Sequence, residues 1–413
     1  MAQVQQGIVF GVMSLLAVSA ATQAASLGGM IDEKEDVGGL PTTAGLSTGS
    51  GNVSGISGSL GAGMTSAEDF EDMYLVQIVD PANLSIETST LGWAEFPSRL
   101  WLFRANPLFR ESAFGLLANE DDPQQQAGSF IGSVSTDGTG VQLTDQDAGY
   151  YFVAISPDLR FPRAKTGGGQ LEAIFHLAVP TEVSGPDGPA GGDSFEDTGD
   201  WVGAGAGGAY QVRTHGLAFA IPPASGPGND TCQTPKPITS GVPIPFSNVH
   251  ATTSGVHDPT CPLPRQDVWF SWTADCDGVA TFSTCDSTNF DSVIVIWGAD
   301  CGAPLYGCND NGNGCLGGTS SISGPVEVGE SYFIQVGSPI GLPAGVGWGT
   351  LRVDCVPDGG CPGDITGDGS VGIADLLDVI DQWGQNGVPA DVNNDGTVNV
   401  LDLLIVIDSW GPC

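Results

Sequence analysis

The sequence predicts a mainly β protein: two tandem antiparallel β-sandwiches of jelly-roll type, followed by a small α-helical domain. Gly (62 residues) and Pro (28 residues) are abundant, and short segments alternate apolar and polar residues between turns, which is typical of all-β domains. Similar sequence blocks occur in the same order in two halves of the chain. Close to the C-terminus, helix-like apolar spacing follows each of two Asp-rich loops.

The N-terminal residues predict a secretory signal peptide over residues 1–24. An apolar run from Ile8 to Ala20 precedes the small-residue stretch ATQAAS, the pattern of an h-region and cleavage zone, although no Lys or Arg comes before the run. The run has 13 residues, fewer than the roughly 20 that span a bilayer. We therefore expect a protein that is secreted, extracellular or at the cell surface, with no membrane insertion.

The charge balance narrows the classes of partner. The chain has 48 acidic and 11 basic residues, and its net charge is −37. Such a field repels phosphate backbones and anionic headgroups, so we expect no nucleic-acid partner, and it favours divalent cations. Adaptation to a salty medium is an alternative explanation of the same composition.

An internal repeat sets the predicted domains. The segment from Phe70 to Phe103 aligns with that from Arg265 to Trp297, because in each an Asp precedes an aromatic-containing strand that leads through a turn to further strands. The blocks GLLANEDD and AGYYFVAISP recur as LYGCNDNG and ESYFIQVGSP. The expected domains are a first sandwich at 27–220, a linker at 221–228, a second sandwich at 229–355, a linker at 356–360 and a tail at 361–413.

The repeated blocks resemble the jelly-roll modules of the bacterial pre-peptidase C-terminal type, as found in secreted planctomycete proteins. The resemblance is carried by the Asp-aromatic strand starts, the ANEDD and CNDN turns, and the YYFVAIS and YFIQVG strands. It covers most of residues 32–355 and implies two antiparallel sandwiches.

The tail repeats a 12-residue loop at an offset of 27, with 12 identities in 21 aligned positions. Ca²⁺ takes about six to eight oxygen ligands, which such a loop supplies from positions 1, 3, 5, 7, 9 and 12, with Gly at position 6 for the turn. The second loop therefore predicts a calcium site, with Gly396 at the turn. Its ligands would be Asp391, Asn393, Asp395, the carbonyl of Thr397, Asn399 and Asp402.

The first loop offers a poorer set of ligands. They would be Asp364, Thr366, Asp368, the carbonyl of Ser370 and Asp375. Thr366 is neutral, and position 9 is Gly372, where a water would have to serve. We expect two calcium sites, with the second stronger than the first.

Loops that end in Asp and are each followed by one helix resemble the type I dockerin domain, over Cys361–Cys413. The resemblance implies calcium binding and docking to a cohesin partner, in a setting where polysaccharide is processed. Family contacts fall largely at loop positions 10 and 11, often a small hydroxyl pair, and the matching residues here are Ile373, Ala374, Val400 and Leu401. This departure leaves open a different protein partner, or packing against the neighbouring sandwich.

Ten Cys in an exported chain predict disulfides, because disulfides persist outside the cytoplasm. Cys361 and Cys413 flank the tail, and the dockerin resemblance brings its ends together, so we expect a bridge between them. In the second sandwich we expect first Cys232 with Cys261, and then Cys308 with Cys315 across the CNDNGNGC turn. The pairing of the other four Cys does not follow from the sequence.

No catalytic signature is present: the sequence lacks a G-x-S-x-G turn, an H-E-x-x-H motif and a phosphate-binding loop. Five Trp on or beside expected strands are predicted to fill cores rather than stack on sugars: Trp93, Trp101, Trp269, Trp272 and Trp297. We therefore expect a non-catalytic secreted modular protein that docks through its tail. The alternatives are a carbohydrate-binding accessory protein acting through the sandwiches, and a glycoside hydrolase with an unrecognised site.

Overall fold

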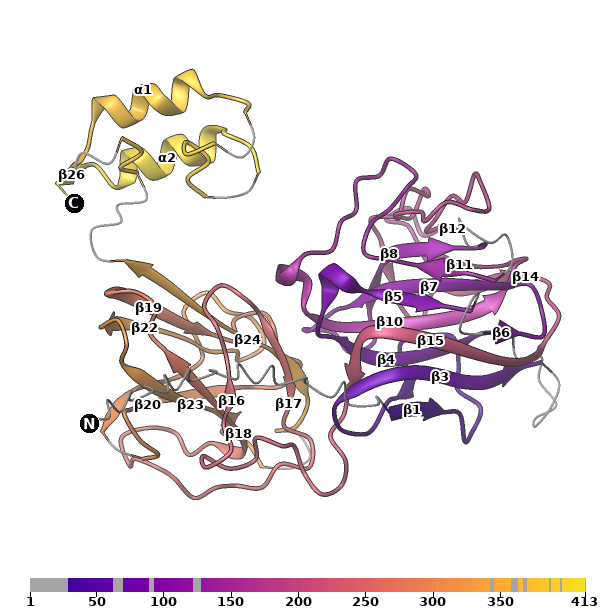
Figure 1. Cartoon of the computed structure of the whole chain (residues 1–413), viewed down its shortest axis with the longest axis horizontal. Helices are drawn as coiled ribbons and strands as arrows, with labels where there is room; N and C mark the ends of the chain where they lie inside the picture. The colour runs from indigo at the N-terminus through magenta and orange to yellow at the C-terminus, as the bar shows by residue number, and fades with distance from the viewer. Residues whose placement is uncertain are drawn as a thin grey trace, which may run out of the picture.

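A computed structural model describes residues 29–61, 70–88, 93–121, 128–302, 304–341, 345–357, 363–366, 370–385, 388–393 and 396–412. The predicted signal peptide lies outside these residues. The described chain is mainly β, as predicted, with several mostly antiparallel sheets and two short helices near the C-terminus (Figure 1). None of its described helices is long and apolar enough to cross a bilayer.

The first sandwich has two layers that share strand β15. One layer runs β1-β3-β15-β5-β9, and the other runs β4-β10-β7-β8-β13. The end of β15 pairs with β4, so the sheet is continuous between the layers, and Gly216 (φ +83°) lies where β15 changes partner from β5 to β4. The strands are β1 (Gly29–Asp32), β2 (Gly45–Leu46), β3 (Asn52–Leu60), β4 (Asp72–Ile78), β5 (Ser85–Glu87), β6 (Trp93–Ala94), β7 (Ser98–Ala105), β8 (Ala113–Asn119), β9 (Phe130–Ile131), β10 (Gly149–Pro157), β13 (Ser194–Phe195) and β15 (Gly208–Phe219), with short 3₁₀ turns η1 (Pro81–Asn83) and η2 (Asp145–Asp147).

A third layer, which was not predicted from the sequence, covers the outer face of β10. All nine residues of β10 are buried, so both faces of this strand are covered. A small separate sheet is formed by β11 (Arg160–Lys165), β12 (Leu171–Ala173) and β14 (Asp200–Gly203). Aromatic rings from this region pack on the rings of β7 with centroid distances of 5.2 to 6.0 Å; the rings are Phe175, Phe195 and Trp201 against Trp101 and Phe103.

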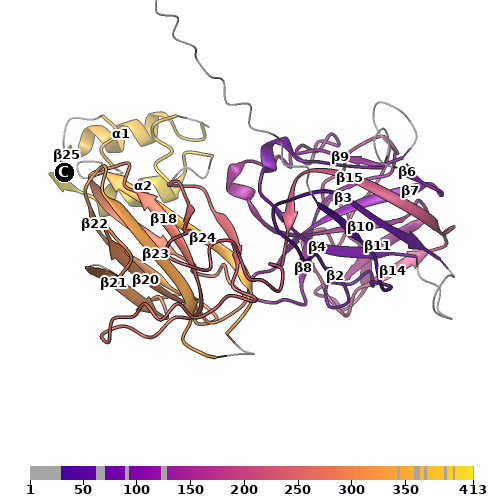
Figure 2. The same ribbon diagram turned by 60° about the horizontal axis from the view of Figure 1, so that its bottom comes forward.

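The second sandwich repeats the strand order of the first. Its layers run β18-β23-β20-β21 and β17-β24-β19-β22, matching β4-β10-β7-β8 and β3-β15-β5-β9. Figure 2 shows the second sandwich, in orange, beside the first, in purple. The repeat inferred from the sequence is therefore present in the sheet topology. The strands are β16 (Lys236–Pro237), β17 (Ile244–Ser247), β18 (Arg265–Thr273), β19 (Gly278–Ser283), β20 (Val293–Gly298), β21 (Leu305–Asp310), β22 (Ser321–Val326), β23 (Ser331–Ser338) and β24 (Trp348–Pro357).

The Asp residues at the repeated strand starts are buried in both sandwiches. Asp72 accepts a hydrogen bond from the hydroxyl of Tyr210 (2.5 Å). Asp267 accepts from the indole N–H of Trp269 (2.8 Å) and the amide of Gln335 (3.1 Å). The repeated Asp thus ties its strand to neighbouring elements, because a buried carboxylate requires such donors.

A buried hydroxyl network is also duplicated. Its members are Thr88, Ser98 and Ser129 in the first sandwich and Thr284, Ser292 and Ser320 in the second. The Thr and first Ser hydroxyls lie 2.9 and 2.8 Å apart in the two copies, and the second Ser donates to the carbonyl of the first Ser at 2.6 Å in both. Asn119 and Asn309, from the matched turn blocks, each accept from the backbone N–H that follows the second Ser, at 2.7 and 3.1 Å.

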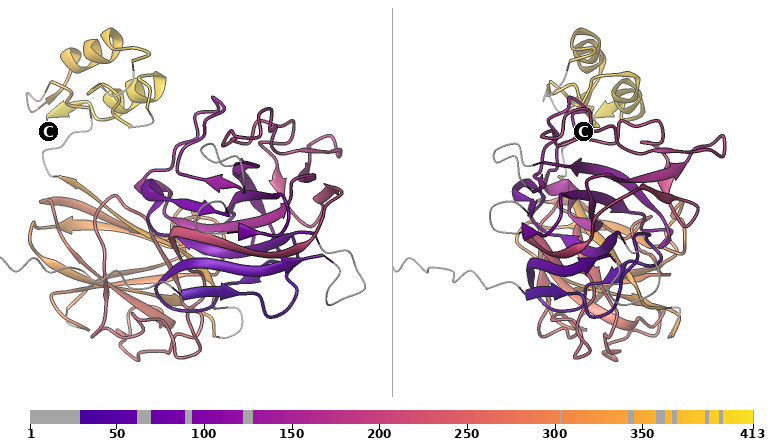
Figure 3. Two further views of the ribbon diagram at one scale, coloured as in Figure 1. Left: turned by 45° about the vertical axis from the view of Figure 1, so that its right-hand side comes forward. Right: turned by 90° about the vertical axis from the view of Figure 1, so that its right-hand side faces the viewer.

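The two sandwiches lie side by side (Figure 3). Side chains cross between them at a contact that we call the seam. Trp348 of β24 stacks on Tyr150 of β10, with ring centroids 4.4 Å apart, and belongs to the aromatic core of the first sandwich. The Tyr150 hydroxyl donates to the carbonyl of Phe246 (2.7 Å). Ile221, assigned to the linker from the sequence, is also buried in this core. The second sandwich therefore completes the core of the first.

Two predicted disulfides are wrong. The second sandwich contains Cys232–Cys301, Cys261–Cys308, Cys276–Cys355 and Cys285–Cys315. Each of the four Cys in the predicted pairs Cys232–Cys261 and Cys308–Cys315 instead bonds to a residue that is farther away in the sequence than its predicted partner. The predicted bridge between Cys361 and Cys413 lies outside the described residues.

Candidate calcium-binding and docking site in the tail

The tail contains two short helices that pack together, α1 (Ile373–Asp381) and α2 (Val400–Asp408) (Figures 1 and 3). Apolar spacing after each loop predicted helices at these places. The buried core between them consists of small apolar residues, Val371, Val379, Ala390, Val398 and Val406. Four of the five are related by the 27-residue offset, so the repeat supplies both halves of the core.

Each loop is bonded to the segment that follows the helix of the other unit. Strand β25 (Ser370–Val371) of the first loop pairs with β26 (Gly411–Pro412), which follows α2. In the second loop, Val398 accepts from the N–H of Gly384 (2.9 Å) and donates to the carbonyl of Gln385 (3.0 Å), after α1. The two units therefore hold each other in a two-fold arrangement.

The second loop is organised around its last carboxylate. Asp402, at position 12, accepts hydrogen bonds from the N–H groups of Asn393 (3.1 Å) and Asn399 (2.8 Å), at positions 3 and 9. Asp391, at position 1, accepts from the N–H of Gly396 (3.0 Å), whose φ of +93° suits glycine. Backbone donors thus draw the first and last carboxylates into the loop.

The first loop makes the equivalent bonds. Asp375 accepts from the N–H groups of Thr366 (2.9 Å) and Gly372 (2.8 Å), again at positions 3 and 9, and from the Thr366 hydroxyl (3.0 Å). Burial opposes ionisation of Asp375, but these donors hold the pKa of its carboxyl below the usual value. The described parts of the two loops therefore share the same bonds to the last carboxylate.

The loops differ at position 9. Asn399 caps α2, because its side-chain oxygen accepts from the N–H of Leu401 (2.8 Å) while its own N–H bonds to Asp402, a reciprocal cap. Gly372 has no side chain to cap α1. The second loop consequently has one more side-chain oxygen and a better helix start.

The described residues fit a calcium site. Asp375, Asp391 and Asp402 are buried, and buried carboxylates need a counter-charge. The tail contains no Lys, Arg or His to supply one, whereas Ca²⁺ binds oxygen donors of this kind. When bound, the ion would supply the missing positive charge. The position-5 residues Asp368 and Asp395 lie outside the described residues.

Two stripes of exposed apolar side chains run along the helices, and we call them the docking stripes. Each side chain is between 49% and 68% exposed; they are Ile373, Leu377, Ile380 and Trp383 on the first unit and Val400, Leu401, Leu404, Ile407 and Trp410 on the second. Ala374 is exposed as well. All four predicted contact residues are therefore accessible and do not pack on the described second sandwich. The rest of the stripes was not predicted, although their helical spacing and 27-residue offset are visible in the sequence.

The Trp residues of the sandwiches are mostly structural. Trp101, Trp269, Trp272 and Trp297 are buried, as predicted, but Trp93 is 48% exposed, so its predicted core position is wrong. Trp93 lies on the two-residue strand β6, which pairs only with the early part of β15 among the described strands. Core packing thus accounts for four of the five.

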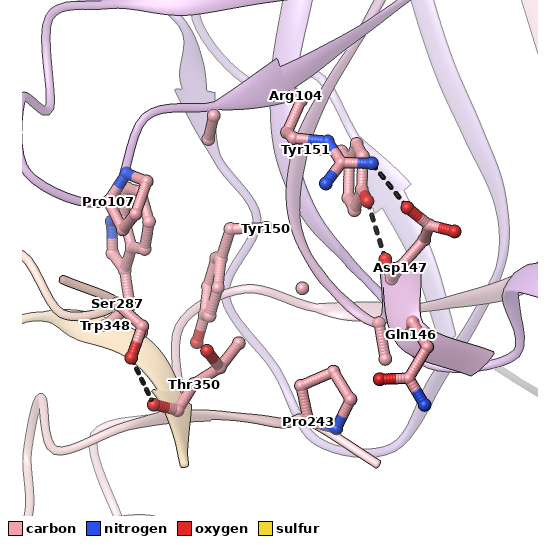
Figure 4. Close-up of a pocket in the computed structure, with 14 residues that line it drawn as sticks. Arg104, Pro107, Gln146, Asp147, Tyr150, Tyr151, Pro243, Ser287, Trp348 and Thr350 are labelled. Atoms are coloured by element: carbon pink, nitrogen blue, oxygen red, sulfur yellow. Dashed lines mark hydrogen bonds and ion pairs between the residues drawn. The ribbon is translucent and has the colours of Figure 1, made fainter. Parts of the chain in front are cut away.

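A small pocket of about 180 Å³ lies at the seam (Figure 4). Tyr150 and Trp348 line it together with Thr350 from the second sandwich and the ion pair of Arg104 with Asp147 (2.5 Å) from the first. A cavity of this size admits only a small ligand. Aromatic and hydrogen-bonding groups from both sandwiches meet in it.

Comparison with known proteins identifies the tail alone. Residues 362–409 match the family model described as Dockerin type I domain. No curated protein matches the chain. The resemblance of the sandwiches to the pre-peptidase C-terminal type remains a prediction.

Two similar solved structures each share 9% sequence identity with the chain. One is an uncharacterized protein from Burkholderia cenocepacia, with 72% of this chain and 81% of that chain covered and a TM-score of 0.17. Another is the CUB1-EGF-CUB2 domain of human MASP-1/3, with 72% and 99% covered and a TM-score of 0.16. Scores this low carry no argument for the sandwiches. The family match supports the dockerin resemblance of the tail, in agreement with its paired loops and helices.

Proposed function

We propose that this chain is a secreted, non-catalytic modular protein whose tail binds two Ca²⁺ ions and attaches the paired sandwiches to a cohesin partner in an extracellular assembly. The observation that carries the proposal is that each unit of the tail joins a calcium-type loop to an exposed apolar stripe. Exposed apolar surface repeated on two helices favours a protein partner, because water-exposed stripes of this kind are costly unless covered.

Calcium binding and docking are expected to be coupled. The carboxylates Asp375 and Asp402 close their loops and lie within the first turn of α1 and α2. Their hydrogen bonds to loop amides therefore connect each loop to the start of its helix. Because metal binding supplies folding free energy to such a site, the ion would stabilise the helices that carry the stripes.

The calcium sites are tested by calorimetric titration of Ca²⁺ into the metal-free full-length chain, followed by circular dichroism. Two sites are expected, with the second tighter because its loop has the fuller ligand set. Asp402→Asn should remove the tighter site and Asp375→Asn the weaker one, while Glu35→Gln on the first sandwich should change neither. A wild-type chain that takes up no Ca²⁺ would end this proposal.

Docking is tested by measuring binding of the full-length chain to purified type I cohesin modules. Binding should appear in Ca²⁺ and disappear when EDTA is added. Leu377→Ser together with Leu404→Ser should weaken it, because both residues are exposed on the stripes and their loss leaves the buried core intact. Binding that persists after chelation would separate docking from calcium and contradict the proposal.

The setting that we propose is polysaccharide processing, and the dockerin type I match supports it. A second candidate function is carbohydrate binding by the sandwiches, which is favoured by the seam pocket and by the exposed ring of Trp93. A glycan array probed with the full-length chain and with Trp93→Ala tests it, and an array without binding removes it. Hydrolysis of a glycoside panel by the full chain would instead overturn the non-catalytic assignment.

A further inference from the structure

Each tail helix ends on an acidic residue at the same position of the repeat. Helix α1 ends at Asp381 and α2 ends at Asp408, 27 residues later. Both are exposed, and each directly follows an exposed Ile of a docking stripe, Ile380 or Ile407. The two carboxylates therefore border the stripes at equivalent places.

This position is unfavourable for the helices themselves. The C-terminal end of a helix carries partial negative charge, so it favours Lys or Arg and disfavours Asp. Neither helix has a basic residue in its last turn. Side chains that break a local rule without a compensating local gain are expected at functional surfaces. Here the same rule is broken twice, beside the same kind of surface.

The charge of the whole tail has one sign. Residues 361–413 contain nine Asp and no Glu, Lys, Arg or His. Bound Ca²⁺ would offset the carboxylates of the loops, but Asp378, Asp381 and Asp408 lie outside the loops. A second copy of this chain would bring its own acidic residues to the stripes, so like-charge repulsion opposes self-association.

We propose that the tail docks onto a protein face whose apolar centre is bordered by Lys or Arg side chains. This inference rests on the proposed docking function and adds the chemistry of the partner. The apolar centre covers the docking stripes, and the basic border lies against Asp381 and Asp408. Charge pairs at the rim of an interface mainly speed association and select the partner.

The test uses the calcium-loaded full-length chain and one type I cohesin module prepared in two forms. The forms carry either Lys or Glu at the same positions around the apolar face of the cohesin. The Lys form should bind at least about tenfold more tightly than the Glu form, and the difference should shrink as salt is raised.

Variants of the chain separate recognition from folding. Asp381→Lys with Asp408→Lys should reverse the preference for the two cohesin forms, while the thermal stability of the tail stays equal or rises, because Lys suits a helix C-terminus. A matched control, Glu35→Lys with Glu327→Lys, makes the same charge change at exposed positions of the sandwiches. The control should keep the preference of the unmodified chain.

The outcomes distinguish this inference from the docking proposal. If both cohesin forms bind equally, or if the double Lys variant keeps the original preference, the partner chemistry is wrong while docking stands. If neither form binds in Ca²⁺, both docking to a cohesin and the inference built on it are overturned.

Discussion

The two sandwiches share one strand order but cover the same sheet face by different means. In the first, rings of the third layer pack on the outer face of β4-β10-β7-β8, and this sandwich has no Cys. In the second, the equivalent face of β18-β23-β20-β21 is covered by a cluster that includes the disulfides Cys232–Cys301 and Cys261–Cys308. The same face of the sheet is thus buried by an inserted apolar layer in the first sandwich and by loops held by disulfides in the second.

What the sandwiches have in common lies elsewhere. The buried strand-start Asp and the Thr-Ser-Ser network are present in both, with nearly the same distances. Buried hydrogen-bonded groups fix the relative position of strands, because any shift would break their bonds. The polar network therefore belongs to the shared topology, whereas the cover of the outer face varies.

Reduction of the disulfides should have the largest effect and should separate the two sandwiches. Each disulfide contributes about 2–4 kcal/mol by restricting the unfolded chain. Scanning calorimetry with and without reductant should therefore show a large fall in the unfolding temperature of the second sandwich. The unfolding temperature of the first sandwich should fall less, and only because unfolding of the second sandwich removes the contacts at the seam. Equal losses in both sandwiches would show that the disulfides do not stabilise the second sandwich selectively.

Trp348→Ala should destabilise the first sandwich by about 3–5 kcal/mol, although the residue belongs to the second. The reason is that its ring fills the core around Tyr150. Trp272→Ala is the matched control, since Trp272 packs only in the core of the second sandwich. Chemical denaturation followed by tryptophan fluorescence measures both. A first sandwich that is insensitive to Trp348→Ala would show that the seam is not part of its core.

Glu120→Gln and Asp310→Asn should change the stability of their sandwiches in opposite directions. The two acidic residues directly follow the matched residues Asn119 and Asn309. Glu120 pairs with the buried Arg99, so its neutralisation should cost about 1.5–3 kcal/mol. Burial raises the pKa of Asp310, and burial followed by the charge of Asp310 raises that of Asp291.

The sign of the pH dependence follows from these shifts. A raised carboxyl pKa favours the protonated folded form, so this contribution to stability is present at low pH and is lost as the pH rises through the folded-state pKa. Asp310→Asn should therefore stabilise the second sandwich at neutral pH. In the pH range where carboxyl groups titrate, the stability of this variant should change less with pH than that of the unmodified chain. Denaturation midpoints of both variants at several pH values measure these changes. If Glu120→Gln and Asp310→Asn both stabilise or both destabilise the protein at neutral pH, the prediction is wrong.

The smallest effects are expected from the shared network, and they should be equal. Thr88→Val and Thr284→Val each remove a buried hydroxyl and should cost about 1–2 kcal/mol. Thr281→Val removes a hydroxyl from a partly exposed pair with Ser323 and should cost less. Denaturant titration of all three variants tests the comparison. A large difference between Thr88→Val and Thr284→Val would mean that the two networks have different roles.

The sequence by itself determined the features that depend on local order. The Asp-aromatic strand starts and the YYFVAIS and YFIQVG blocks predicted the strands and the repeat, because period-2 patterns and turn residues act over a few positions. The two 12-residue loops and their offset of 27 predicted a calcium-type loop followed by a helix, since such a loop carries its ligands at fixed spacing.

Only the tertiary structure decided what depends on distant residues. Cys285 pairs with Cys315 because the Thr284–Ser320 bond brings their segments together, and short sequence separation had favoured Cys308 instead. Trp348 enters the core of the first sandwich, and Phe195 and Trp201 cover the outer face of β7, through contacts between residues far apart in the chain. Side-chain packing of this kind has no period in the sequence, because a buried ring needs only an apolar surface that the fold places beside it.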